Sequence, residues 1–183
     1  MRREAERASY GSILVPILGT SLDDDIVQTA GRLAADEHAD EAEGEGATIE
    51  ALWVFEVPMS LPIDARLPDT QLDQARAALR RAKAVGEEYE GVEVATATVR
   101  ARQAGHAIVE EARRRGVEVI VLGAEEPSRI RGGGRLGGRG NPMENFVGEV
   151  TKYVLSKAPC RVILTAPARE DARPLEAAEG SST

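Results

Sequence analysis

The 183-residue chain has little of several features that mark common protein classes. Its single cysteine, Cys160, cannot form a disulfide within the chain, and a reducing cytoplasmic setting is expected. No apolar run approaches the roughly 18 residues that a membrane-spanning helix needs. Aromatic residues are only 3% of the chain and the net charge is −8, which together argue against a nucleic-acid-binding surface. A soluble protein with no nucleic acid partner is therefore expected.

The sequence does contain a regular alternation of short apolar runs and longer amphipathic segments. The runs predict strands, and the segments repeat apolar residues at helical spacing. The expected strands are 11–18, 48–58, 91–101, 117–123 and 160–167, and the expected helices are 21–38, 69–89, 104–116 and 142–159. This order predicts an α/β fold with an open five-stranded, mostly parallel sheet and helices on both faces.

The chain is expected to divide into an N-terminal arm (1–10), one α/β domain (11–167) and a flexible, small and polar C-terminal tail (168–183). Ligands of open α/β sheets bind at the carboxyl ends of the strands. Pro16, Val54 and Gly123 stand at or near three such ends, so they are predicted to border a ligand site.

Several other residues are given structural roles. Ser21 is expected to cap the first helix, with Asp23–Asp25 in its first turn beside the positive end of the helix dipole. Trp53 and Cys160 are expected to pack in the core. The sequence shows no Ser-His-Asp set, paired-carboxylate site or zinc spacing, so we predict no catalytic residue and no metal ligand.

A glycine- and arginine-rich segment, Ser128–Pro142, follows the strand that ends at Gly123. It has six glycines and four arginines and no apolar stripe. Three interpretations stay open: a flexible surface insertion, an anion site in which arginines such as Arg135 and Arg139 bind phosphate, or a docking strip for an acidic or membrane-surface partner.

Four stretches of the chain resemble the universal stress protein family. In the family's order they are ILVPILGTS, IEALWVFEVP, GHAIVEEARRRGVEVIVLGAEE and VGEVTKYVLSKAPCRVIL. The resemblance implies an adenine nucleotide α-hydrolase-like fold and a homodimer that pairs through the last strand, across Val162–Thr165. It also implies a regulatory role in the stress response.

The resemblance also implies where a nucleotide would bind. Family members that bind ATP carry a loop of the form G-x2-G-x9-G-[ST]. Gly123 matches its first glycine, Gly138 and Gly148 have the spacing of the other two, and Val150 and Thr151 fit the residues that follow. Gly148 lies 25 positions after Gly123, where the motif requires 13, so the loop carries an insertion.

Two substitutions at this predicted site disfavour ATP. Leu18 stands where the family has an Asp after the first strand, and Glu149 replaces the Ser or Thr of the loop. A carboxylate beside a triphosphate is repulsive. The ligand stays open between an adenine nucleotide and a cyclic dinucleotide.

The function expected first is a non-catalytic universal-stress-type regulator, a dimer that senses a nucleotide or acts as an adaptor. Two alternatives stay open. One is an ATP-binding member of the family with weak ATPase activity. The other is a regulatory domain that serves a membrane transporter in trans, because residues 137–167 resemble the members that are fused to permeases.

Overall fold

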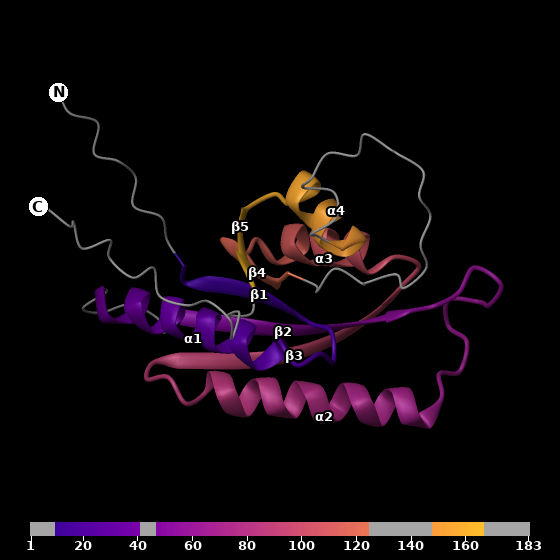
Figure 1. Ribbon diagram of the computed structural model, residues 1–183, viewed down its shortest axis with the longest axis horizontal. Helices are drawn as coiled ribbons and strands as arrows, with labels where there is room; N and C mark the ends of the chain where they lie inside the picture. Colours follow the sequence, from indigo (N-terminus) through magenta and orange to yellow (C-terminus); the bar gives the residue numbers. More distant parts are fainter. Residues whose placement is uncertain (1–9, 41–46, 125–147, 167–183) are drawn as a thin grey trace, which may run out of the picture.

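Five parallel strands form one sheet in the order β3-β2-β1-β4-β5 (Figure 1). The strands are β1 (Ser12–Ile17), β2 (Ala47–Glu56), β3 (Val92–Ala101), β4 (Val119–Gly123) and β5 (Arg161–Thr165). The helices are α1 (Asp23–Asp40), α2 (Asp69–Gly86), α3 (Ala104–Arg115) and α4 (Glu149–Lys157). The computed structural model describes residues 10–40, 47–124 and 148–166, and over them the predicted α/β fold is confirmed.

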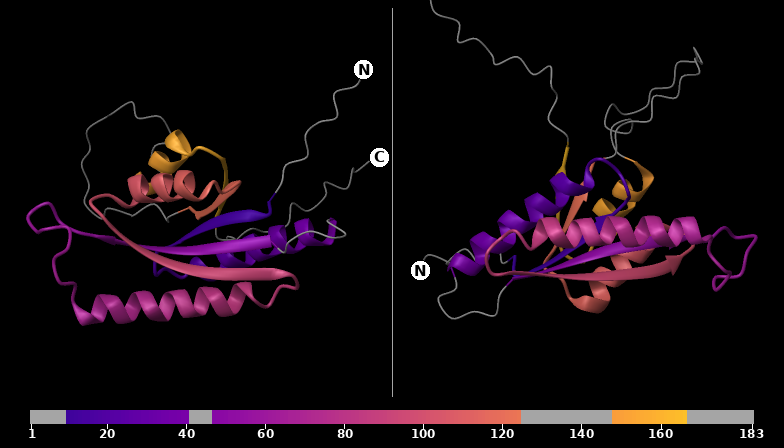
Figure 2. Two further views of the ribbon diagram at one scale, coloured as in Figure 1. Left: turned by 180° about the vertical axis from the view of Figure 1, so that it is seen from behind. Right: turned by 90° about the horizontal axis from the view of Figure 1, so that it is seen from below.

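The central strand β1 is buried on both faces, because every residue from Ile13 to Ile17 is apolar. The side chains of Ile13 and Val15 join one apolar cluster, and that of Leu14 joins the other. Helices α1 and α2 cover the first face, and α3 and α4 cover the second (Figures 1 and 2). The sheet is therefore the middle of three layers.

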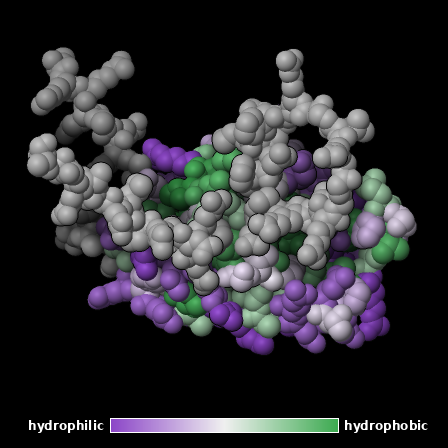
Figure 3. Space-filling model, viewed as in Figure 1, coloured by the Kyte–Doolittle hydropathy of each residue, from purple (hydrophilic) through white to green (hydrophobic). Residues whose placement is uncertain are grey.

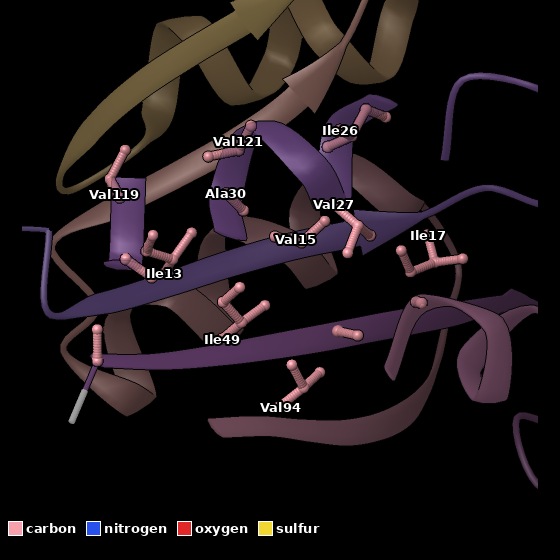
Figure 4. Packing of buried hydrophobic residues seen from close by; sticks show 14 of the residues in the cluster. Ile13, Val15, Ile17, Ile26, Val27, Ala30, Ile49, Val94, Val119 and Val121 are labelled. Carbon is pink, nitrogen blue, oxygen red and sulfur yellow. The ribbon is translucent and has the colours of Figure 1, made fainter. Parts of the chain in front are cut away.

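The larger cluster lies between the sheet and the two helices α1 and α2. Ile26, Val27 and Ala30 of α1 are fully buried and lie close to Val15 of β1 and Val121 of β4 (Figure 4). These apolar residues recur at helical spacing on α1 and at every second position on the strands, as the sequence pattern predicts. Packing of this cluster fixes α1 across β1 and β4.

An ion-pair network ties the carboxyl end of α3 to β2. Arg115 contacts Glu50 at 2.8 Å and Glu111 at 2.9 Å. The hydrogen bond from Arg114, with that from Arg115, holds the pKa of Glu111 below its usual range. Burial raises the pKa of Glu50, and Arg115 opposes that shift. Gly116 then ends the helix with a φ of 65°, the left-handed conformation that glycine adopts without strain.

The predicted boundaries differ from the observed ones by a few residues. The first helix begins at Asp23, and Thr20 rather than Ser21 provides the hydroxyl that accepts a hydrogen bond there, from Leu22 N at 3.3 Å. Residues 142–147 of the last predicted helix lie outside the described residues, as do the predicted arm, except for Tyr10, and the whole of the predicted tail. Tyr10 packs against the larger cluster. Within the described ranges, no helix has the length and apolarity needed to cross a membrane.

The contact between α2 and β3 leaves no room for a side chain at Gly86. A Cβ there would lie 2.6 Å from Val94 Cγ2. We expect Gly86→Ala to lower the free energy of unfolding by up to about 2 kcal/mol, because overpacking costs about 1–3 kcal/mol and higher helix propensity returns about 1 kcal/mol. Urea unfolding measures the change.

Val94→Ala provides the matched test of this contact, because it removes the methyl group that the new Cβ would meet. The double variant should lose less stability than the sum of the two single variants. Strictly additive losses would show that Gly86 and Val94 do not constrain each other.

Candidate functional site

A hollow of about 350 Å³ opens at the carboxyl ends of β1 and β2, on the side of the sheet covered by α3 and α4. Most of its lining is apolar: Pro16, Leu18, Leu52, Val54, Ala104, Ile108 and Val150. These residues come from two strands, the turn after β1 and two helices, so the hollow exists only in the folded chain. Its size falls in the range of small-molecule sites, about 300–1,000 Å³.

Glu56 supplies a charged group to this apolar hollow. It is the last residue of β2, and among the described residues that line the hollow it alone is charged. Its carboxylate accepts a hydrogen bond of 2.6 Å from the N–H of Ala104, the first residue of α3. Glu56 therefore joins the end of a strand to the start of a helix at the edge of the hollow.

The turn after β1 forms another edge of the hollow and is closed by Asp23. The Asp23 carboxylate accepts hydrogen bonds from Leu18 N at 3.2 Å, Gly19 N at 2.8 Å and Thr20 Oγ1 at 3.4 Å. Burial raises the pKa of this carboxyl, and the N–H groups of Leu18 and Gly19 oppose the shift. Asp23 is only 9% exposed and acts as an internal brace of the turn.

Gly19 allows the turn to pass close to Trp53. Its φ is 74°, and a Cβ on it would lie 3.0 Å from Trp53 Cη2 and 3.1 Å from Gln74 Nε2. Trp53, expected in the core, is half-buried, and its ring packs against the ring of Phe55 with the centroids 6.2 Å apart. The indole therefore supports the turn at the edge of the hollow.

A second hollow of about 500 Å³ lies on the opposite face, between the start of α1 and the middle of α2. It is polar at one end, where Arg81 Nε donates to Asp24 Oδ1 at 2.7 Å. The ion pair links α2 to α1, and the Asp24 carboxylate compensates the charge of Arg81. In the described part of the chain, no group of three or more His, Cys, Asp or Glu could hold a metal ion.

The structure brings three predicted site residues together, since Pro16, Val54 and Val150 all line the first hollow. Gly148 occupies the N-cap position of α4, and Thr151, in the first turn of that helix, is 2% exposed. Both flank Val150 at the start of α4, but neither is among the residues that line the hollow.

Gly123 ends β4, and a Cβ on it would lie 2.7 Å from Ile26 Cδ1. Close packing of α1 thus accounts for a glycine at this position, whatever binds nearby. The other predicted residues, Arg135, Gly138 and Arg139, lie outside the described residues with the rest of Ser128–Pro142.

Sequence reasoning missed two carboxylates that shape the site. Asp23 was assigned to the first turn of a helix and not to the turn before it, and Glu56 was not singled out. The position of Glu56 at a strand end is the one sequence feature that points to a role at the site. Its contact with Ala104 could not be predicted, because Ala104 lies 48 residues further along the chain.

Comparisons with known proteins agree with this architecture. The model of the universal stress protein family matches residues 9–166. Among solved structures, the universal stress protein UspA from Lactobacillus plantarum has a TM-score of 0.61 and 22% identity, covering 86% of this chain and 99% of that one. No curated protein matches the sequence.

Two further solved structures contain nucleotides. A universal stress protein from Archaeoglobus fulgidus in complex with dAMP has a TM-score of 0.55 and 18% identity over 84% of this chain and 95% of its own. A universal stress protein in complex with cAMP has a TM-score of 0.60 and 18% identity over 86% of this chain and 98% of its own. At these identities the likeness concerns the fold.

The brace at Asp23 yields a stability prediction. Asp23→Ala leaves the N–H groups of Leu18 and Gly19 without their acceptor, so the free energy of unfolding should fall by about 1–3 kcal/mol. Asp25→Ala is the matched control, because Asp25 lies in the same helical turn but is exposed. Its effect should stay within about 0.5 kcal/mol in the same urea titration. Equal losses in the two variants would contradict the brace.

Proposed function

Because the chain belongs to the universal stress protein family, we propose that it is a non-catalytic cytoplasmic regulator that binds an adenine nucleotide in the hollow at the ends of β1 and β2. The observation that carries the proposal is the apolar hollow itself, lined from both sides by Pro16, Val54 and Val150. Transfer of a flat, largely apolar base from water to such a surface is favourable, because it removes apolar area from water.

The complexes of dAMP and cAMP with relatives of the same fold support this class of ligand. Both of those ligands carry one phosphate. Two features of this chain disfavour a triphosphate: Leu18 provides no polar side chain at the edge of the hollow, and Glu149 places a carboxylate in the first turn of α4. The Glu149 side chain is 91% exposed and its carboxylate lies 3.0 Å from the Lys152 ammonium group. Solvent and Lys152 therefore weaken the repulsion between this carboxylate and a triphosphate without removing it.

We expect AMP to bind more tightly than ATP in calorimetry. Leu18→Trp should fill the hollow and weaken AMP binding about tenfold or more, a loss of about 1.4 kcal/mol. Ile63→Trp is the control, because it adds the same indole to a residue that is 42% exposed in the loop after β2. Tighter binding of ATP than of AMP, or equal AMP binding by both variants, would contradict the proposal.

The proposed regulator is also a homodimer through β5. This strand is at the edge of the sheet, and in the described part of the chain it pairs with β4 alone. Val162 and Ile163 are half-buried and Leu164 is 38% exposed, so an apolar strand edge faces outward. Protein edges of this kind are normally covered, and a second copy would extend the sheet.

Light scattering at micromolar concentration should therefore give the mass of a dimer. Leu164→Lys should shift the protein toward monomer, because a charge on an edge strand opposes pairing. Leu61→Lys, at an exposed residue of the loop after β2, should leave the dimer intact. A monomeric wild-type protein would show that β5 is not a dimer interface.

A further inference from the structure

We propose that Glu56 selects the sugar of the bound nucleotide, because its carboxylate accepts hydrogen bonds from ribose hydroxyl groups. This inference rests on the proposed function and adds to it a residue that decides specificity. It is carried by the way the structure holds this carboxylate at the edge of an otherwise apolar hollow.

One oxygen of the carboxylate is fixed and the other is available. Oε1 accepts from Ala104 N at 2.6 Å, where the N-cap residue Gln103 provides no side-chain acceptor of its own. Oε2 has no hydrogen bond or ion pair within the described residues. The contact with α3 therefore limits the rotation of the carboxylate while leaving an acceptor for a ligand.

The neighbouring arginines do not neutralise Glu56. Arg102, just beyond the end of β3, donates to the backbone oxygens of Val57 and Pro58. Arg100 donates to the backbone oxygen of Ala65 at 3.0 Å. Both guanidinium groups thus hold the loop after β2, whose apolar residues lie at the right edge of Figure 3. The hydrogen bonds of both arginines go to backbone oxygens and not to the Glu56 carboxylate.

The distribution of polarity sets the direction in which a nucleotide would lie. Leu52 and Ile108, which are fully buried, form the apolar depth of the hollow, whereas Glu56 is exposed at its edge. The base would occupy the apolar part and the sugar would meet the edge. Carboxylates accept hydrogen bonds from ribose 2′-hydroxyl groups in other α/β folds, and they repel a phosphate placed at the same point. Glu56 should thus favour ribose over deoxyribose and reject 2′- or 3′-phosphates.

The test compares the affinities of AMP and 2′-deoxy-AMP by calorimetry in wild type and Glu56→Gln. Glutamine keeps an acceptor for Ala104 N, so the start of α3 should remain in place. Wild type should prefer AMP by about tenfold or more, as expected for a hydrogen bond to a charged group, and the variant by about threefold or less. Glu93→Gln removes the same charge at the far end of the sheet and should keep the wild-type ratio.

The ratio of two affinities separates sugar selection from a general effect on folding. If Glu56→Gln unfolds, Glu56→Asp keeps the charge but withdraws it by one methylene group, and it too should lower the ratio. AMP binding with an unchanged ratio in these variants, or with no preference in wild type, would overturn the role of Glu56 and leave the proposed function standing. Failure of wild type to bind either nucleotide would instead overturn the proposed function, and the inference with it.

Discussion

Burial of β1 on both faces is the constraint on which the rest of the structure depends. A strand with apolar residues at successive positions cannot leave either face in water, so helices must cover both sides of the sheet. Right-handed crossovers then require the chain to extend the sheet first to one side of β1 and later to the other. The order β3-β2-β1-β4-β5 is the result. It leaves the ends of the central strands uncovered where the connections leave in opposite directions.

The turn and the helix start beside these strand ends carry backbone N–H groups that need acceptors, and in this chain two carboxylates supply them. Asp23 turns inward and satisfies the N–H groups of the turn after β1. Glu56 satisfies the first N–H of α3 but stays exposed to the hollow. The two acids have the same charge and similar partners, yet their burial differs. Asp23 is therefore confined to stability, whereas Glu56 remains available to a ligand.

Patterns of apolar residues along the chain were enough to predict the elements and the layers. The strand-end position of Pro16 and Val54 followed from the fold, and both residues line the hollow. The roles of Asp23 and Glu56 could not be predicted in this way. Asp23 binds to residues that precede its helix, where propensity alone assigns it to the helix dipole. Glu56 meets Ala104 only because β2 and α3 are brought together by the sheet, and such contacts carry no signal in local spacing. Trp53 packs against the core as the strand pattern predicts, but that pattern does not show that its indole also contacts the turn at Gly19.

The claim that the hollow at the ends of β1 and β2 is the nucleotide site is tested most directly by a methyl NMR titration with AMP. The account predicts that the methyl signals of Leu18, Val54 and Val150 shift, because all three residues line the hollow, while those of Met59 and Leu155 stay in place. Shifts concentrated at Ala77 and Ala78, in the hollow beside Arg81, would contradict it.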